Sequence, residues 1–98
     1  MLGKIYSVLG TGSCFIKGGE VVDSYLLSDK EIKLIEEIAK VTPHLPEKFK
    51  IGFFEHEEGK AIVLRHGEGF ICFPAKSDNV MNELRRVEAE VYDKILSH

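Results

Sequence analysis

The segment 50–75 constrains the fold most, because it contains three short apolar runs separated by two turns. The runs, 51–54, 61–64 and 70–73, are rich in β-branched and aromatic residues, which is typical of strands. Both turns contain glycine, which readily adopts the positive φ of a tight hairpin. The segment therefore predicts an antiparallel meander of three strands.

Consecutive residues in these runs are both apolar, as in Phe53 and Phe54 or Ile62 and Val63. Because consecutive strand residues point to opposite faces, a sheet with one face in water would alternate apolar and polar residues. This sheet is expected to be covered on both faces. The rest of the chain must supply two covering layers.

The N-terminal part supplies two more strands, since a Lys-Gly-Gly-Glu turn at 17–20 separates the runs 13–16 and 21–27. Residues 1–9 are ambiguous. Their apolar residues have the spacing of a short helix that Gly10 would stop, whereas Tyr6 and Val8 would also suit a strand.

A helix is predicted from Ser28 to about Val41, ended by Pro43 and Pro46. Ser28 and Glu31 have the spacing of a capping box. Apolar residues fill about half of its circumference, more than the ~100° stripe that one sheet requires. The excess hints at a second apolar neighbour, such as the same helix of a partner chain. A wide core stripe in a monomer is the alternative.

A last helix is predicted to follow Pro74 and to reach almost to His98, with Ser77, Asp78 and Asn79 as candidate caps. Glu90 and Lys94 are spaced to form an i, i+4 ion pair on its solvent side. The apolar stripe of this helix comprises Val80, Leu84, Val87, Val91 and Ile95.

All 98 residues are thus expected to form a single domain of the α/β (α+β) class. One five-stranded antiparallel-type sheet lies between helices on its two faces, in the order α-β-β-α-β-β-β-α. The net charge of −3 provides no basic surface for nucleic acid or anionic lipid. No apolar run approaches the ~20 residues of a membrane span, and no secretory leader is evident.

Few residues suggest chemistry. Cys14 and Cys72 lie in apolar runs without metal-ligand spacing and are expected to be buried core thiols, which fits a reducing, cytoplasmic setting. Cys72 lacks a histidine partner, and Ser13 is not in a nucleophile elbow. No catalytic, cofactor or metal site is predicted, and the chain is not expected to be an enzyme. His56 and His66 could meet on one edge, so a metal-dependent enzyme is a weaker possibility.

Two blocks of the sequence resemble the roadblock family, the dynein light-chain type of small α/β/α domain with a profilin-like sandwich. Residues 8–24 are similar to the glycine entry into the first strand, the glycine turn and the second strand of that family. Residues 59–64 and 69–73, followed by Asn79 and a long helix, are similar to its last hairpin and final helix. The very short first helix departs from the family pattern.

The resemblance implies a non-enzymatic module that forms a homodimer, or pairs with a paralogue, and acts as a scaffold or regulator of a small Ras-like GTPase. Family dimers join through the third strand and the second helix. At the corresponding positions of this sequence, the resemblance implies the interface candidates Leu34, Ile35, Ile38, Ile51 and Phe53. The alternative is a small ligand-sensing domain with a pocket between sheet and helix.

Overall fold

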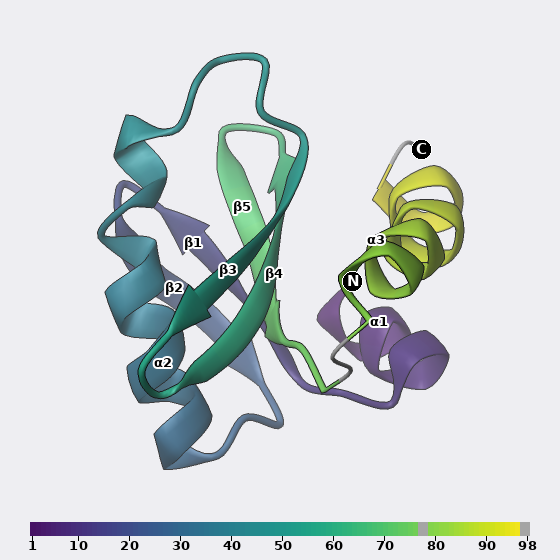
Figure 1. Ribbon diagram of the computed structural model, residues 1–98, viewed down its shortest axis with the longest axis horizontal. Helices are drawn as coiled ribbons and strands as arrows, with labels where there is room; N and C mark the ends of the chain where they lie inside the picture. Colours follow the sequence, from purple (N-terminus) through teal and green to yellow (C-terminus); the bar gives the residue numbers. More distant parts are fainter. Residues whose placement is uncertain (77–78, 97–98) are drawn as a thin grey trace.

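The computed structural model describes residues 1–76 and 79–96 and has the predicted order of helices and strands (Figure 1). The only addition among these residues is η1, a short 3₁₀ helix. The elements are α1 (Leu2–Leu9), β1 (Ser13–Lys17), β2 (Glu20–Tyr25), α2 (Asp29–Ala39), η1 (Thr42–His44), β3 (Ile51–His56), β4 (Gly59–His66), β5 (Gly69–Pro74), α3 (Val80–Val87) and η2 (Glu88–Leu96).

The five strands form one antiparallel sheet in the order β2-β1-β5-β4-β3. β1 and β2 form one hairpin, and β3, β4 and β5 form the predicted meander. Among the described strands, only the pairing of β1 with β5 joins these two parts of the chain. β2 and β3 are therefore the two edges of the sheet.

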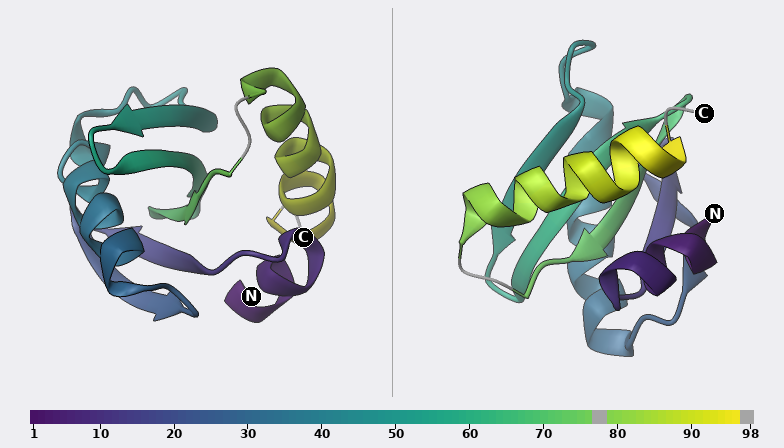
Figure 2. Two further views of the ribbon diagram at one scale, coloured as in Figure 1. Left: turned by 60° about the horizontal axis from the view of Figure 1, so that its bottom comes forward. Right: turned by 90° about the vertical axis from the view of Figure 1, so that its right-hand side faces the viewer.

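The sheet is covered on both faces, as the sequence predicts (Figure 2). α2 lies on one face, and α1, α3 and η2 lie on the other. The buried cluster under α2 comprises Cys14, Ile16, Leu34, Ile35, Ile38, Ala39, Ala61, Val63, Phe70 and Cys72. The cluster on the opposite face comprises Ile5, Ile62, Leu64, Ile71, Phe73, Val87 and Val91.

The ambiguous N-terminal segment is a helix. α1 buries Ile5 against the sheet, and the backbone N–H of Gly10 donates to the carbonyl oxygen of Tyr6 at 2.8 Å. Gly10 adopts φ 70°, the left-handed conformation that commonly ends a helix. Packing of Ile5 compensates for the low intrinsic stability of so short a helix.

α2 begins with the predicted capping box. The Ser28 hydroxyl accepts from the Glu31 N–H at 3.2 Å, and the Glu31 carboxylate accepts from the Ser28 N–H at 2.9 Å. The helix ends at Ala39, earlier than the predicted Val41. The Thr42 hydroxyl donates to the Ala39 carbonyl oxygen at 2.7 Å, which satisfies an acceptor that the next helical turn would otherwise use.

The C-terminal helix begins with Asn79, whose side chain accepts from the Asn82 N–H at 3.2 Å. The other candidate caps, Ser77 and Asp78, lie outside the described residues. α3 continues directly into η2, which is wound as a π-helix. No helix within residues 1–76 and 79–96 combines the length and the apolar character that crossing a membrane requires.

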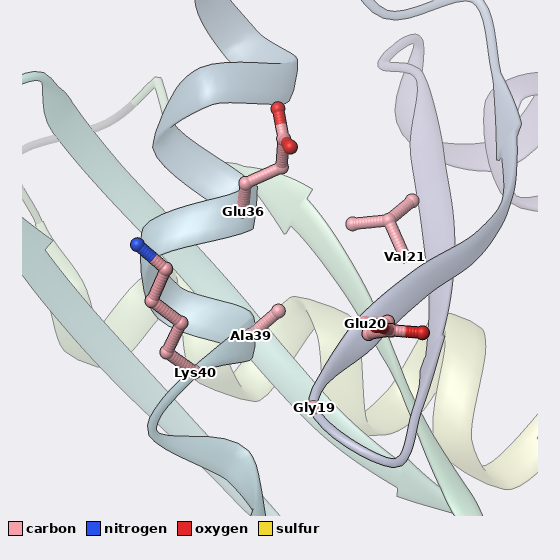
Figure 3. A pocket seen from close by; sticks show the side chains of 6 residues that line it. All are labelled: Gly19, Glu20, Val21, Glu36, Ala39 and Lys40. Atoms are coloured by element: carbon pink, nitrogen blue, oxygen red, sulfur yellow. The ribbon is translucent and has the colours of Figure 1, made fainter.

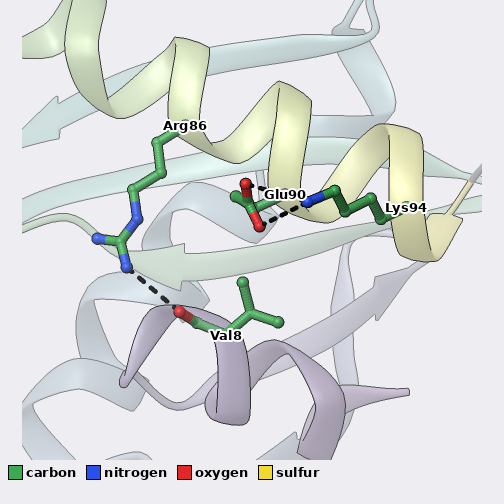
Figure 4. A network of polar contacts seen from close by, with 4 residues as sticks. All are labelled: Val8, Arg86, Glu90 and Lys94. Carbon is green, nitrogen blue, oxygen red and sulfur yellow. Dashed lines mark hydrogen bonds and ion pairs between the residues drawn. The ribbon is translucent and has the colours of Figure 1, made fainter.

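Two polar contacts of this helix are shown in Figure 4. Arg86 donates to the carbonyl oxygen of Val8 at 3.2 Å and so joins α3 to the C-terminal end of α1. Glu90 and Lys94 form the predicted i, i+4 ion pair at 3.2 Å. The bond from Arg86 satisfies one of the carbonyl groups that α1 leaves unpaired at its C-terminal end.

Candidate functional site

The two histidines of the metal hypothesis do not meet. His56 pairs with Gly59 at the start of β4, whereas His66 is the last residue of β4. At roughly 3.3 Å per strand residue, the length of β4 puts them on the order of 20 Å apart. They therefore do not form the shared edge site that the sequence left open as a weaker possibility, because the two turns lie at opposite ends of β4. His56 instead accepts from the Glu58 N–H at 3.2 Å.

No three histidine, cysteine, aspartate or glutamate side chains converge as metal ligands within the described ranges. The thiols of Cys14 and Cys72 are free and fully buried, as predicted. A hydrogen bond with Cys14 and burial in the core raise the pKa of Cys72 well above its ordinary value. A thiol in this environment stays protonated at neutral pH and is a poor nucleophile.

The two edges of the sheet differ in how they are protected. Along β2, the register shifts between Phe15 and Ile16, which leaves Val22 outside the pairing, and Glu20 and Asp23 are exposed. Bulges and charges of this kind prevent another strand from pairing with an edge. The β2 edge is therefore poorly suited to strand addition.

β3 has none of this protection over its first four residues, Ile-Gly-Phe-Phe at 51–54. It pairs with β4 over six positions without a register shift, and its apolar side chains are half-buried. No strand in the described part of the chain pairs with its outer edge. A regular, uncharged edge can extend the sheet by pairing with a further strand.

The structure separates the five predicted interface residues into two groups. Leu34 and Ile38 are 4% exposed and Ile35 is 0% exposed, so the sheet of the same chain covers all three. Their burial explains the wide apolar stripe of α2 without a partner. Ile51 and Phe53 are half-buried on β3 and pack against the core of the opposite face. As interface residues, all five remain predictions.

Val41 is an apolar residue close to the end of α2 that the interface prediction omits. It is 46% exposed, although it lies in the same apolar stripe as Leu34. Lys40 and Val41 follow α2 but keep right-handed helical backbone angles, so Val41 lies two helical turns beyond Leu34 and on the same side. Leu34 on that side approaches Gly59, where the β3–β4 hairpin turns. Val41 therefore extends the apolar surface on the side of α2 that faces this hairpin.

A cleft of about 290 Å³ lies between the start of α1 and the sheet. Its lining combines apolar side chains with the carboxylate of Asp23 and the imidazole of His66. Phe15 forms part of the lining and contacts His66 edge to face, with ring centroids 6.4 Å apart. The volume lies close to the lower limit of the ~300–1,000 Å³ of ligand pockets.

Comparison with known proteins shows that the chain is similar to an archaeal protein. No family model matches the chain. The chain is 75% identical over 97 residues to a protein of Archaeoglobus fulgidus described as an uncharacterized protein, and the match covers 99% of each chain. The chain belongs to the family of this archaeal protein. The description of the relative names no activity, so it assigns no role to the edge, the thiols or the cleft.

A larger hollow of about 470 Å³ lies between the β1–β2 turn and the C-terminal part of α2 (Figure 3). Ala39 and Val21 form its apolar part. The Lys40 ammonium pairs with Glu37 at 3.1 Å, and the Glu20 carboxylate points away from α2. Because its charged groups do not converge, this hollow offers no recognisable ligand chemistry.

Sequence reasoning missed an exposed aromatic pair, Tyr6 and Tyr25, and the exposed Leu26 that follows Tyr25 in the chain. The two tyrosine rings meet edge to face, with centroids 6.0 Å apart. Leu26 is 62% exposed and adopts φ 50°, a conformation uncommon for leucine. The run 21–27 predicted a strand through this position, and no sequence signal marks the positive φ.

Proposed function

We propose that this chain is a non-enzymatic module that forms a homodimer, or pairs with a related chain, and regulates a small Ras-like GTPase as a scaffold. The unprotected β3 edge is the observation that carries the proposal. The β2 edge is protected by an unpaired residue and exposed carboxylates, whereas 51–54 on β3 is regularly paired and uncharged. An edge of this kind in a stable protein is expected to have a partner.

A two-fold axis beside β3 would pair this strand antiparallel with its own copy. Such an interface is isologous, so each residue on one side meets the equivalent surface on the other. α2 lies on one face of the same sheet, and its side facing the β3–β4 hairpin carries the exposed Val41. The two copies of α2 would then approach each other across the axis and cover Val41.

The GTPase partner rests on the resemblance to the roadblock family. In this mechanism the module performs no chemistry and shifts the GTPase between conformations by binding its two nucleotide states with different affinity. The protonated state of the buried Cys72 thiol supports a binding role over a nucleophilic one. We also place the chain in the cytoplasm, the setting that the sequence predicts from its two core cysteines, both of which are buried.

The experiment is a binding titration of the chain against the Ras-like GTPases of its own organism. Each GTPase is loaded with GDP or with a non-hydrolysable GTP analogue. Val41→Glu is the test variant, and Val22→Glu on the other edge, where valine is 55% exposed, is the matched control. We expect saturable binding that differs at least about tenfold between nucleotide states and is weakened only by Val41→Glu. Equal affinity for both states, or no binding, contradicts a regulatory role.

The cleft between α1 and the sheet supports a second candidate, the ligand-sensing domain. Asp23 provides a negative charge beside the aromatic ring of Phe15, a combination suited to a small apolar cation such as an aromatic amine. Burial of the ligand's apolar part against the Phe15 ring would supply affinity. The Asp23 carboxylate would favour a cation over an anion.

This candidate is tested by NMR titration of the ¹⁵N-labelled chain with aromatic amines and aromatic carboxylates of equal size. The ligand-sensing account predicts saturable shifts at Phe15, Asp23 and His66 with amines alone. It also predicts that Asp23→Asn weakens binding about tenfold, which corresponds to loss of a charge-assisted contact. Shifts that do not saturate, or that are the same with carboxylates, contradict the account.

A further inference from the structure

Cys14 and Cys72 lie directly opposite each other on neighbouring strands. They are partners in the antiparallel register of β1 and β5, and both side chains belong to the core cluster under α2. Directly opposite residues of an antiparallel pair have Cα atoms roughly 4.5–5.5 Å apart. This separation lies within the range that a disulfide bond spans without backbone movement.

The position of the pair gives such a bond a structural consequence. The pairing of β1 with β5 has three residue pairs, whereas β1 with β2 has five, and β3 with β4 and β4 with β5 have six each. It is also the pairing that joins the N-terminal hairpin to the meander. Cys14 and Cys72 stand at one end of this short, non-local junction.

We propose that Cys14 and Cys72 are a redox-active pair that forms a cross-strand disulfide and fastens the β1–β5 junction covalently. The structure holds the reduced form, with both thiols free.

The oxidant is a low-molecular-weight disulfide. One cysteine, as its thiolate, attacks this disulfide, forming a mixed disulfide and releasing one small thiol. The second thiolate attacks the cysteine sulfur of the mixed disulfide, and the second small thiol leaves. Two protein thiols are thereby oxidised, and one small disulfide is reduced to two thiols.

Both side chains are 0% exposed, so the first attack requires the sheet to open locally or the chain to be folding. In the closed state, burial and the neighbouring thiol keep the pKa of Cys72 high, which suppresses the reactive thiolate. Once formed, the disulfide is shielded from reducing thiols by the same burial. The pair therefore responds slowly in the folded protein and quickly during folding.

The test is to refold the full-length chain in a series of mixtures of oxidised and reduced glutathione, and then to measure its intact mass and Tm. We expect the intact mass of one chain less two hydrogen atoms, with no bound glutathione and no disulfide between chains, and a Tm higher by on the order of 10 °C. A reducing agent should reverse both changes. These measurements use the native chain, so they do not depend on whether a variant folds.

Cys14→Ala and Cys72→Ala are the control variants, and each should abolish both the mass change and the Tm rise. Three results overturn the proposal: free thiols at every ratio, glutathione attached to both cysteines, or disulfide-linked dimers in place of the internal bond. A Tm that stays the same or falls when the internal bond forms also overturns the fastening role.

Discussion

The guanidinium group of Arg65 donates through Nε to the carbonyl oxygen of Phe49 at 2.8 Å. The same side chain donates through Nη2 to the carbonyl oxygen of Pro46 at 3.0 Å and lies over the ring of Phe70, 4.8 Å from its centroid. Arg65 on β4 thus holds the connection that leads from η1 into β3. It fixes the start of the edge strand on which the proposed dimer depends.

Arg65→Lys should therefore lower the free energy of unfolding by about 1–2 kcal/mol, because a single ammonium cannot reproduce the two directed bonds and the stacking. Urea unfolding followed by circular dichroism measures the change. Arg85→Lys, at an exposed position on α3, is the control and should change stability by less than about 0.5 kcal/mol. Equal effects of the two substitutions would contradict the anchoring role of Arg65.

Gly12 lies against the backbone of Leu26, whose carbonyl oxygen occupies the space that a Cβ atom at position 12 would need. Gly12→Ala should therefore destabilise the chain by about 3 kcal/mol or prevent folding, since the contact is with backbone that cannot rotate away. Gly18→Ala is the comparison. Gly18 has φ +62° with open space around its Cβ position, so only the backbone conformation is unfavourable, at about 1 kcal/mol. Thermal unfolding of both variants should show this ranking, and the reverse order would contradict it.

Removing either of two buried hydroxyl groups should change the free energy of unfolding, but in opposite directions. The hydroxyl of Ser13 has no hydrogen-bond partner among the described residues, so Ser13→Ala should raise the free energy of unfolding by about 1 kcal/mol. The hydroxyl of Thr42 donates to Ala39, so Thr42→Val should lower it by a similar amount. Denaturant unfolding of both variants provides the measurement. A loss of stability in Ser13→Ala would show that its hydroxyl is satisfied.

Much of this fold could be predicted from local patterns. The capping box at Ser28, the glycine turns and the doubly apolar strands each specify a structure within a few residues, and the structure confirms each of them. The pairing of β1 with β5 has no such local signal, because its partners come from distant parts of the chain. The facing arrangement of Cys14 and Cys72 was therefore not predicted.

The candidate interface was only partly accessible to sequence reasoning. Hydrophobic periodicity identifies the apolar residues of α2 but does not show which of them the chain's own sheet covers. Leu34 and Val41 belong to one stripe, yet only Val41 is substantially exposed, since it lies beyond the last residue of α2. The separation of His56 from His66 follows from the strand pairing rather than from their distance in sequence.

The raised pKa of Cys72 predicts a loss of stability in alkali. Below the ordinary thiol pKa of 9.0, the folded and unfolded states both keep the proton, so the group has no effect on the pH dependence. Above it, the unfolded chain loses the proton while the folded chain keeps it. The free energy of unfolding should then fall by up to ~1.4 kcal/mol per pH unit. Urea unfolding between about pH 8 and pH 11 in a reducing buffer measures this slope. Cys72→Ala should show a shallower slope, and identical slopes would contradict the shift.

Dimer formation through β3 and α2 is tested by the solution mass of the chain, measured by size exclusion with light scattering over a concentration series. We expect a mass near twice 11.0 kDa at high concentration, with Val41→Glu shifted toward the mass of one chain and Val22→Glu unchanged. A monomer at every concentration would contradict self-association through β3 and α2. A dimer that Val22→Glu disrupts and Val41→Glu does not would assign the interface to the β2 edge instead.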